Sequence, residues 1–378
     1  MRRRSRRLRL GVAGVLALAL VAVAAALGLR ARPTDPLLGP SVAPQATTRP
    51  LEPVPSTRPP GVTEPPPGTG LSRYTGQQLT WRPCRGALQC ANVLAPLDYA
   101  APDGPAVTLV MARLGNGRAR LGSLFLNPGG PGGSGLDLLA AFDRTGLEAY
   151  DLVSWDPRGV GESTPVRCFA GQALEAYVTV DVSPDDAAER DRLLRGQTAF
   201  NRSCLKESGV LLPHISTADT VADLDLLRGL LNQPKLNYLG FSYGTQIGAI
   251  YADRYGPRVG RMVLDGAVDL HDQSVPQAQG FERALRNFAT WCARRRCPLG
   301  QDRAGVLATV TGLWRRLDAE PMPVGDRELN QTLALSGALT LLYEDERSWP
   351  ILVTALDAAN RRDGRGLLRL ADVFNRRG

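Results

Sequence analysis

The sequence predicts an α/β fold, with a mostly parallel β-sheet and crossover helices followed by an all-helical subdomain. Two observations predict it. Between residues 71 and 270, short apolar runs that end in Gly, Pro or Asp alternate with stretches of helical spacing, as strands and crossover helices do around a parallel sheet. After Asp269 the strand-like runs stop and apolar residues recur only at helical spacing. We therefore expect a core over residues 71–270 and a helical cap, or lid, over residues 271–378.

The expected strands are short and rich in Val, Leu and aromatic residues. Several are apolar throughout, which is typical of strands that are covered on both faces. The clearest crossover helix is 217–231, which Thr217 or Asp219 can cap. The expected strands are VTLVMARL (107–114), SLFLN (123–127), YDLVSWD (150–156), LNYLGF (236–241) and RMVLDG (261–266).

The N-terminal region indicates export. Residues 1–32 carry eight arginines and no acid around an apolar run from Leu10 to Leu29, which is typical of a signal peptide or, if uncleaved, a membrane anchor. These arginines account for the whole formal net charge of +8, so we expect no nucleic-acid partner. Residues 33–70 are dense in Pro and predict a disordered linker. We expect a protein that is secreted or held in the cell envelope.

Export gives the six cysteines a meaning, because disulfides persist in oxidising compartments. We favour pairing between neighbours in the sequence, one of 15 possible connectivities, because two of these pairs close short loops; buried free thiols are the alternative. The expected pairs are Cys84–Cys90, Cys168–Cys204 and Cys292–Cys297. Two isolated histidines and paired cysteines make no ligand set, so we expect neither metal nor cofactor.

The stretch LNYLGFSYGTQIGAIYADRYG, residues 236–256, combines a strand, a Gly-x-Ser-x-Gly turn and a helix. This context is that of a nucleophile elbow, in which Ser242 sits in a strained turn and Gly240 and Gly244 leave room for the backbone. The pentapeptide alone is a weak signal, and a structural turn is the alternative. Because a strand precedes it and a helix follows, we interpret Ser242 as the candidate nucleophile.

A glycine-rich loop, LNPGGPGGSG (126–135), directly follows another expected strand. Acyl transfer builds negative charge on a carbonyl oxygen, which free N–H groups of such a loop stabilise. We assign one donor to Gly130, with Gly129 as the fallback, and the other to Tyr243, which follows the nucleophile. A flexible turn or a phosphate cradle is the alternative, but the loop has neither the Lys-Ser/Thr ending of a P-loop nor the spacing of a dinucleotide turn.

A third loop, SWDPRGVGEST (154–164), stands at the end of a further expected strand. It contains Asp156 and Arg158, which are close enough in sequence to form an ion pair. We expect this pair to fix the loop, a structural rather than a catalytic role.

Taken in their order along the chain, these motifs resemble the secreted α/β-hydrolases of actinobacteria, of the tripeptidyl aminopeptidase type and related to proline iminopeptidases. The likeness runs from about Trp81 to the end. It implies an α/β-hydrolase fold with a helical cap, and release of short peptides from free N-termini by a Ser-His-Asp triad. It also implies that Ser242 is the nucleophile and that Gly130 and Tyr243 are the oxyanion donors.

The acid and the histidine of the triad have no match in this sequence. In this fold they follow the serine in that order, on loops beyond the cap, so we expect a C-terminally incomplete copy that lacks the last core strands. Such a sheet has an open edge and predicts poor solubility. We read His214 as a loop or surface residue. His271, with Asp265, Asp269 and Asp272 nearby, is a less favoured candidate for the base.

We therefore expect an exported serine hydrolase, most simply an aminopeptidase with a short peptide substrate, inactive if no base reaches Ser242. One alternative is an esterase or lipase of the same fold, and another is a non-catalytic peptide-binding envelope protein. A peptidase acting on free N-termini needs acidic groups for the ammonium. Glu344, Asp345 and Glu346 are candidates, although acids on a helix are commonly just its solvated face.

Overall fold

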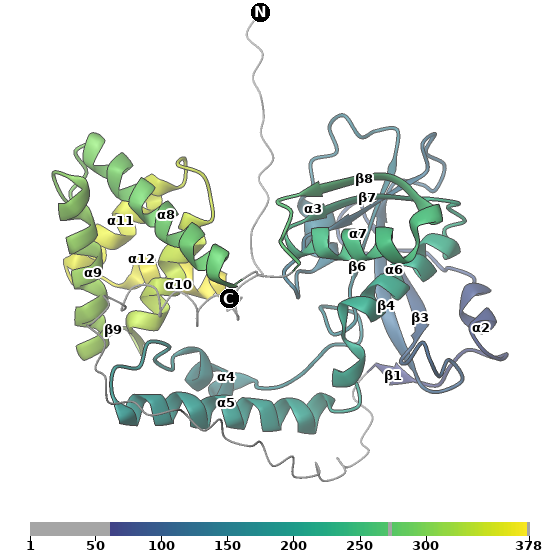
Figure 1. The fold of residues 1–378 in the computed structure, drawn as a ribbon, viewed down its shortest axis with the longest axis horizontal. Coiled ribbons are helices and arrows are strands. Elements are labelled where there is room, and N and C mark those ends of the chain that lie inside the picture. Colours follow the sequence, from purple (N-terminus) through teal and green to yellow (C-terminus); the bar gives the residue numbers. More distant parts are fainter. Residues whose placement is uncertain (1–60, 271–273, 376–378) are drawn as a thin grey trace, which may run out of the picture.

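The core is an eight-stranded mixed sheet built largely from the predicted apolar runs (Figure 1). The computed structural model describes residues 61–270 and 274–375; the expected signal or anchor and His271 lie outside these ranges. The strands follow the spatial order β2-β3-β4-β6-β5-β7-β8, and β1 pairs with β4. Their bounds are β1 Val62–Thr63, β2 Arg82–Pro83, β3 Gln89–Pro96, β4 Ala106–Leu114, β5 Ser123–Asn127, β6 Asp151–Asp156, β7 Leu236–Phe241 and β8 Val259–Asp265.

The sheet has a parallel half and an antiparallel half. β6, β5, β7 and β8 are parallel to one another, whereas β1 to β4 pair antiparallel and β4 joins β6 antiparallel. Three strands of the antiparallel half, β1, β2 and β3, were not predicted. β3 is interrupted by polar residues, which hid its pattern, and β1 lies in the stretch expected to be a linker, where Val62 pairs with Val107.

Helices cover both faces of the parallel half, as the fully buried β5 and β6 require. α3 (Gly135–Ala141) packs on one face. α6 (Thr217–Leu230) and α7 (Tyr243–Arg254) pack on the other, around Phe125, Trp155 and Tyr238. The predicted crossover helix is therefore confirmed, but its N-cap is Ser216 in a capping box with Asp219. The short helices α2 (Ser72–Thr75), η1 (Leu212–His214) and η2 (Gly256–Arg258) complete this part.

Five helices after β8 form a second apolar core of their own. They are α8 (Ser274–Arg294), α9 (Arg303–Ala319), α10 (Gln331–Leu342), α11 (Trp349–Asn360) and α12 (Arg365–Phe374). The expectation of an all-helical subdomain is wrong in one detail, since β9 (Met322–Val324) and β10 (Arg327–Leu329) form a hairpin. Its two-residue turn contains Gly325 at φ +66°, a conformation that glycine adopts without strain.

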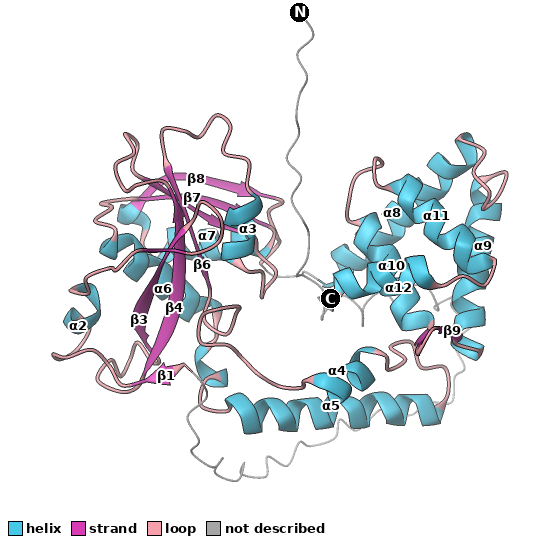
Figure 2. Ribbon diagram, turned by 180° about the vertical axis from the view of Figure 1, so that it is seen from behind, coloured by secondary structure: helices cyan, strands magenta, loops and turns pink. Residues whose placement is uncertain are grey.

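Two helices are inserted between β6 and α6, and the connection between them contacts the start of α10. They are α4 (Gly171–Val178) and α5 (Ala187–Ser208), and Figure 2 shows α5 running from the C-terminal helices back towards the sheet. Asn330 Nδ2 donates to the carbonyl of Thr179 at 2.6 Å, and Thr332 Oγ1 donates to that of Val180 at 3.0 Å. The connection after α4 is thus hydrogen-bonded to the start of α10.

The three predicted disulfides are confirmed. Cys84–Cys90 closes the connection from β2 to β3, Cys168–Cys204 ties the start of the α4–α5 insertion to α5, and Cys292–Cys297 closes the end of α8. None of the helices within residues 61–270 and 274–375 has the length and hydropathy that a bilayer span requires.

The predicted Asp156–Arg158 ion pair is wrong, because Arg158 pairs with Asp223 of α6. Both side chains are fully buried, and Arg158 donates from Nη2 and Nε to the two carboxylate oxygens at 2.6 and 2.7 Å. Tyr99 Oη donates to the same carboxylate at 2.8 Å. The remaining guanidinium hydrogens go to the carbonyls of Pro96, Leu97 and His214. Although burial alone would lower the pKa of Arg158, the contact with Asp223 raises it.

β8 is the edge strand, as expected for an open sheet. Val263, Leu264 and Leu270 are exposed although they are apolar. Val263 lies opposite Leu239 of β7, on the face that α3 covers further along the sheet. Exposed apolar residues on a strand edge favour association between chains.

We predict that Asp223→Ala lowers the free energy of unfolding by about 3–5 kcal/mol, because it leaves a buried guanidinium without its counter-ion. Urea unfolding followed by circular dichroism measures this. The control is Asp345→Ala, which breaks an exposed pair with Arg347 and should leave the unfolding curve unchanged. An equal loss in both variants would contradict the importance of the buried pair.

We predict that Val263→Lys reduces aggregation, because lysine on an edge strand opposes pairing with another chain. Light scattering over a concentration series measures this. The matched control is Val373→Lys in α12, since Val373 is 55% exposed and Val263 is 58% exposed. If the two variants reduce scattering equally, added charge rather than the sheet edge is responsible.

Candidate functional site

Ser242 occupies a strained turn between β7 and α7. Its backbone has φ +53° and ψ −124°, which a non-glycine residue adopts only when its surroundings hold it there. The Ser242 N–H donates to the carbonyl of Asp265 at 3.0 Å. Its own carbonyl accepts from the N–H and the hydroxyl of Thr245, at 2.8 and 2.6 Å. These bonds fix the turn from the neighbouring strand and from the first turn of α7.

Gly240 and Gly244 of the elbow stand where other backbone atoms come too close to leave room for a side chain. A methyl group on Gly240 would lie 2.5 Å from the carbonyl oxygen of Gly244. A methyl group on Gly244 would lie 2.8 Å from the carbonyl oxygen of Asn127 at the end of β5. Any side chain at either position would push α7 away from the sheet, so the Gly-x-Ser-x-Gly pattern has a direct steric cause here.

The glycine-rich loop after β5 packs directly against this elbow. Gly129 has φ +83°, and a methyl group on it would lie 2.3 Å from the carbonyl oxygen of Phe241 and 2.8 Å from the nitrogen of Tyr243. The two segments that the sequence analysis selected independently therefore meet, although more than a hundred residues separate them.

The N–H groups at this junction are not equivalent. The Gly129 N–H donates to Asn127 Oδ1 at 2.9 Å, so it is already engaged. Within the ranges that the structure describes, the N–H groups of Gly130 and Tyr243 donate to no acceptor. Gly130 is buried and Tyr243 half-buried. Of the three predicted oxyanion donors, these two therefore have no acceptor among the described residues, and their role stays a prediction.

Asp156 and Asn127 anchor the glycine-rich loop, and the sequence analysis missed both roles. Asp156 Oδ1 accepts from Ser134 Oγ at 2.7 Å and from the N–H of Leu136 at 3.2 Å, at the start of α3. Asn127 orients Gly129 through the bond described above. A polar residue at the last position of a buried strand, directly before the glycines, was the signal available for Asn127.

The Tyr243 side chain connects the elbow to α6. Its hydroxyl lies 2.7 Å from Thr217 Oγ1 at the start of α6, and burial raises the pKa of this tyrosine. The phenol therefore stays protonated at neutral pH. The Tyr243 hydroxyl thus joins α7 to α6 through Thr217.

The structure brings no imidazole to Ser242 within residues 61–270 and 274–375. His214 ends η1, before α6, where its carbonyl accepts from Arg158 Nη1 at 2.9 Å. Asp265 contacts the elbow through its backbone carbonyl, which accepts from the Ser242 N–H. His271 and Asp272 lie outside the described residues, so their candidacy stays a prediction.

Two acidic groups lie among the helices. Burial, followed by the charge of Asp345, raises the pKa of Glu344, which follows α10. At the start of α5, Asp185, Asp186 and Glu189 bring their carboxylates within 4.8 Å of one another, with mostly exposed side chains. Burial and nearby carboxylates, first among them that of Asp181, raise the pKa of Asp318 to about 6. The second group was not predicted, because the sequence does not show that Asp185 and Glu189 lie near the distant Asp318.

We predict that Gly129→Ala destabilises the protein more than Gly132→Ala. Both glycines have positive φ, +83° and +94°, so both variants incur about 1–3 kcal/mol of backbone strain. Only Gly129→Ala also meets backbone atoms, since nothing lies within 4 Å of a methyl group on Gly132; overpacking adds about 1–3 kcal/mol. Urea unfolding of the two variants measures the difference, and equal values would contradict the packing of the loop on the elbow.

Comparison with known proteins agrees with this geometry. A family model described as the alpha/beta hydrolase fold matches residues 122–352. Serine protease Hip1 of Mycobacterium tuberculosis is 34% identical over 333 residues, covering 80% of this chain and 63% of that protein. Tripeptidyl aminopeptidase of Streptomyces lividans is 35% identical over 251 residues, covering 60% of this chain and 47% of that protein.

A third relative, carboxylesterase B of Mycobacterium tuberculosis, is 36% identical over 326 residues and covers 79% of this chain and 62% of that protein. Among solved structures, a proline iminopeptidase-related protein from Thermus thermophilus covers 79% of this chain and 72% of that chain, at 14% identity and a TM-score of 0.29. The chain spans less than two thirds of the length of the curated relatives named here. By the family model and by these relatives, the chain belongs to the α/β-hydrolase family.

Proposed function

We propose that this chain is an exported serine hydrolase that releases short peptides from free N-termini, with Ser242 as its nucleophile. The observation that carries the proposal is the junction of elbow and glycine-rich loop. It places a serine at φ +53° beside two N–H groups, of Gly130 and Tyr243, that have no acceptor among the described residues. An exposed turn serving only the fold would not need this strain.

In this proposal Ser242 Oγ attacks the scissile carbonyl and forms a tetrahedral intermediate, which collapses to an acyl-enzyme as the amine leaves. The N–H groups of Gly130 and Tyr243 stabilise the oxyanion, a contribution of about 3–4 kcal/mol per donor in water-excluded sites. Water then hydrolyses the acyl-enzyme and releases the short peptide. The rigid turn matters because such donors act only when they are held in place before charge develops.

The proton of Ser242 needs a base, and His271 is our candidate within this sequence. Without a base, turnover falls by several powers of ten and leaves only catalysis by binding and by the oxyanion donors. The proposal therefore separates into two claims: that the serine and its donors are in place, and that a base reaches them.

Peptidase activity is favoured by two relatives, which are named a serine protease and a tripeptidyl aminopeptidase. Glu344 and the acidic group near Asp318 are candidates for binding a substrate ammonium. The relative named carboxylesterase B supports an esterase as the second candidate function.

The proposal of export rests on the basic N-terminal segment and on the three disulfides, because disulfides persist in oxidising compartments.

We predict that a fluorophosphonate forms a stoichiometric covalent adduct with the parent chain and none with Ser242→Ala, because the reagent reports an activated serine. Intact-mass spectrometry measures the adduct. The control is Ser72→Ala, an exposed serine of α2, which should react like the parent. No adduct on the parent would contradict catalysis by this chain and would favour a non-catalytic peptide-binding protein.

The substrate class is tested separately with three substrates of equal acyl length: a tripeptide anilide with a free N-terminus, its N-acetylated form and a simple ester. Preference for the free N-terminus supports the aminopeptidase. Equal hydrolysis of both anilides contradicts the aminopeptidase, and turnover of the ester alone supports the esterase.

The base is tested with His271→Ala. Loss of turnover in this variant, with folding unchanged, would identify His271 as the base.

A further inference from the structure

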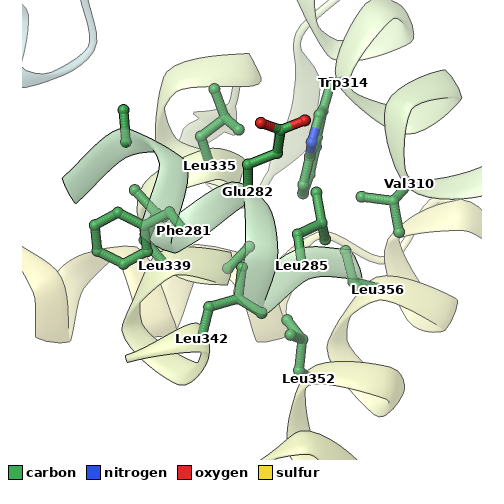
Figure 3. Close-up of a pocket in the computed structure, with 12 residues that line it drawn as sticks. Phe281, Glu282, Leu285, Val310, Trp314, Leu335, Leu339, Leu342, Leu352 and Leu356 are labelled. Carbon is green, nitrogen blue, oxygen red and sulfur yellow. The ribbon is translucent and has the colours of Figure 1, made fainter. Parts of the chain in front are cut away.

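A polar cavity of about 370 Å³ opens at the amino ends of β5 and β6. Ligand pockets typically measure about 300–1,000 Å³, so it has room for a small molecule. The space among α8, α9, α10 and α11 measures only about 30 Å³ and is lined by packed core side chains (Figure 3), so it has no such room. Among the residues that line the polar cavity are Gln78, Trp81, Arg113, Ser123, Asp151 and Asn232.

The cavity and the elbow lie at opposite edges of the sheet. Ser123 and Asp151, the first residues of β5 and β6, line the cavity, whereas Ser242 follows the last residue of β7. β5 runs parallel to both β6 and β7. The carboxyl ends of these strands, where open α/β sheets usually bind ligands, therefore belong to the elbow. A ligand in the cavity would be bound apart from the reaction proposed at Ser242.

Hydrogen bonds between distant segments fix the walls of the cavity. Gln77 Nε2 donates to the carbonyl of Leu94 at 2.7 Å, and Gln77 Oε1 accepts from the Leu94 N–H at 2.9 Å. Gln233 Oε1 accepts from the N–H of Ser123 at 3.1 Å. Asp151 accepts from two N–H groups of the β4–β5 connection. Walls that are fixed before a ligand arrives lower the entropic cost of binding.

Opposite charges line the cavity. Within the described ranges its lining holds one cation, Arg113, and one carboxylate, Asp151. Arg113 stacks on Trp81, with Cζ 4.1 Å from the ring centroid, and donates from Nε and Nη2 to Gln89 Oε1 at 2.9 and 2.8 Å. Burial lowers the pKa of Arg113, and the charge of Asp151 opposes this shift. Because the two charges offset each other and an ion loses hydration on entry, the cavity favours a neutral ligand.

Several polar groups of the lining make no hydrogen bond in the described part of the chain. They are Arg113 Nη1 and the side-chain amides of Gln78 and Asn232. Gly117 leaves Arg113 Nη1 uncovered, since a methyl group on this glycine would lie 2.7 Å from it. An amide both donates and accepts, and so does a hydroxyl group. Trp81 adds apolar surface on which C–H groups can pack.

We propose that this cavity binds a neutral molecule rich in hydroxyl groups, of the size of a monosaccharide. Its hydroxyl oxygens accept from Arg113 Nη1 and from the amides of Gln78 and Asn232, and its hydroxyl hydrogens are donated to the amide oxygens. The cavity holds on the order of ten water molecules at about 30 Å³ each, so a hexose fits it. An anion would meet the charge of Asp151, and a cation would meet that of Arg113.

Isothermal titration calorimetry of the full chain tests the proposal with D-glucose, D-glucuronate and D-glucosamine, which share one ring and differ in charge. The titrations are run at about pH 6, where the amine is protonated. We expect saturable heat with D-glucose, and binding of both charged sugars weaker by about fivefold or more, the value of one hydrogen bond. myo-Inositol serves as a second neutral probe.

Two variants with a matched control locate the site. Arg113→Met should weaken D-glucose binding by about tenfold, as expected for a hydrogen bond from a charged group. It should also favour D-glucosamine relative to D-glucose, because Asp151 then carries the remaining charge. Arg295→Met removes a guanidinium that stacks on Trp291 in the same way, at 4.6 Å, and should leave binding unchanged.

The second variant is Gln78→Ala, which should weaken D-glucose binding by about fivefold. Because Gln78 is exposed, this variant tests the site even if Arg113→Met disturbs the fold, which circular dichroism checks.

Three results would overturn the proposal. They are no saturable heat with D-glucose or myo-inositol up to about 10 mM, equal effects of Arg113→Met and Arg295→Met, or D-glucuronate binding as tightly as D-glucose. The first would mean that the cavity holds only water, the second would place the binding elsewhere, and the third would exclude the preference for a neutral ligand.

Discussion

The buried Arg158–Asp223 ion pair is the interaction on which the arrangement of the core depends. Arg158 follows β6 and Asp223 lies in α6, while the guanidinium also holds carbonyls of the β3–β4 connection and of His214. One side chain therefore joins the antiparallel half of the sheet to the crossover helix. Because α6 leads directly into β7, this junction also determines where the strand that carries Ser242 begins.

The elbow depends in turn on how closely backbone segments approach one another. Gly129, Gly240 and Gly244 each stand where a methyl group would lie within 3 Å of backbone atoms. Their absence of side chains lets β5, β7 and α7 meet at one point. Hydrogen bonds to Asn127 and Asp156, at the ends of β5 and β6, then orient the glycine-rich loop. The N–H groups of Gly130 and Tyr243, which meet no acceptor in the described part of the chain, are held in place by this packing.

The helices after β8 have a core separate from that of the sheet. Their hydrogen bonds to the connection after α4 join them to an insertion that leaves the sheet after β6. Two segments far apart in the sequence thus form one helical part. Its acidic groups are proposed to bind an ammonium, whereas the elbow contributes the reactive group.

The sequence by itself determined the features that are encoded locally. Apolar runs bounded by Gly, Pro or Asp predicted β4 to β8, helical spacing predicted α6, and the cysteines nearest in sequence are the ones that pair. The elbow and its glycines were equally visible, because a strained turn restricts residue types over only five positions. β3 and the β9–β10 hairpin were missed, because their patterns are short and interrupted by polar residues.

Only the tertiary structure decided which groups become partners. Asp156 is two residues from Arg158 in sequence, yet Arg158 pairs with Asp223, which is 65 residues away. Asp156 instead anchors the loop that contains Gly129. The bond from the Gly129 N–H to Asn127 Oδ1, two residues earlier, is local by contrast, and the sequence analysis missed it. A buried charge or N–H takes the acceptor that the packed fold brings within about 3 Å, and that choice depends on every strand and helix at once.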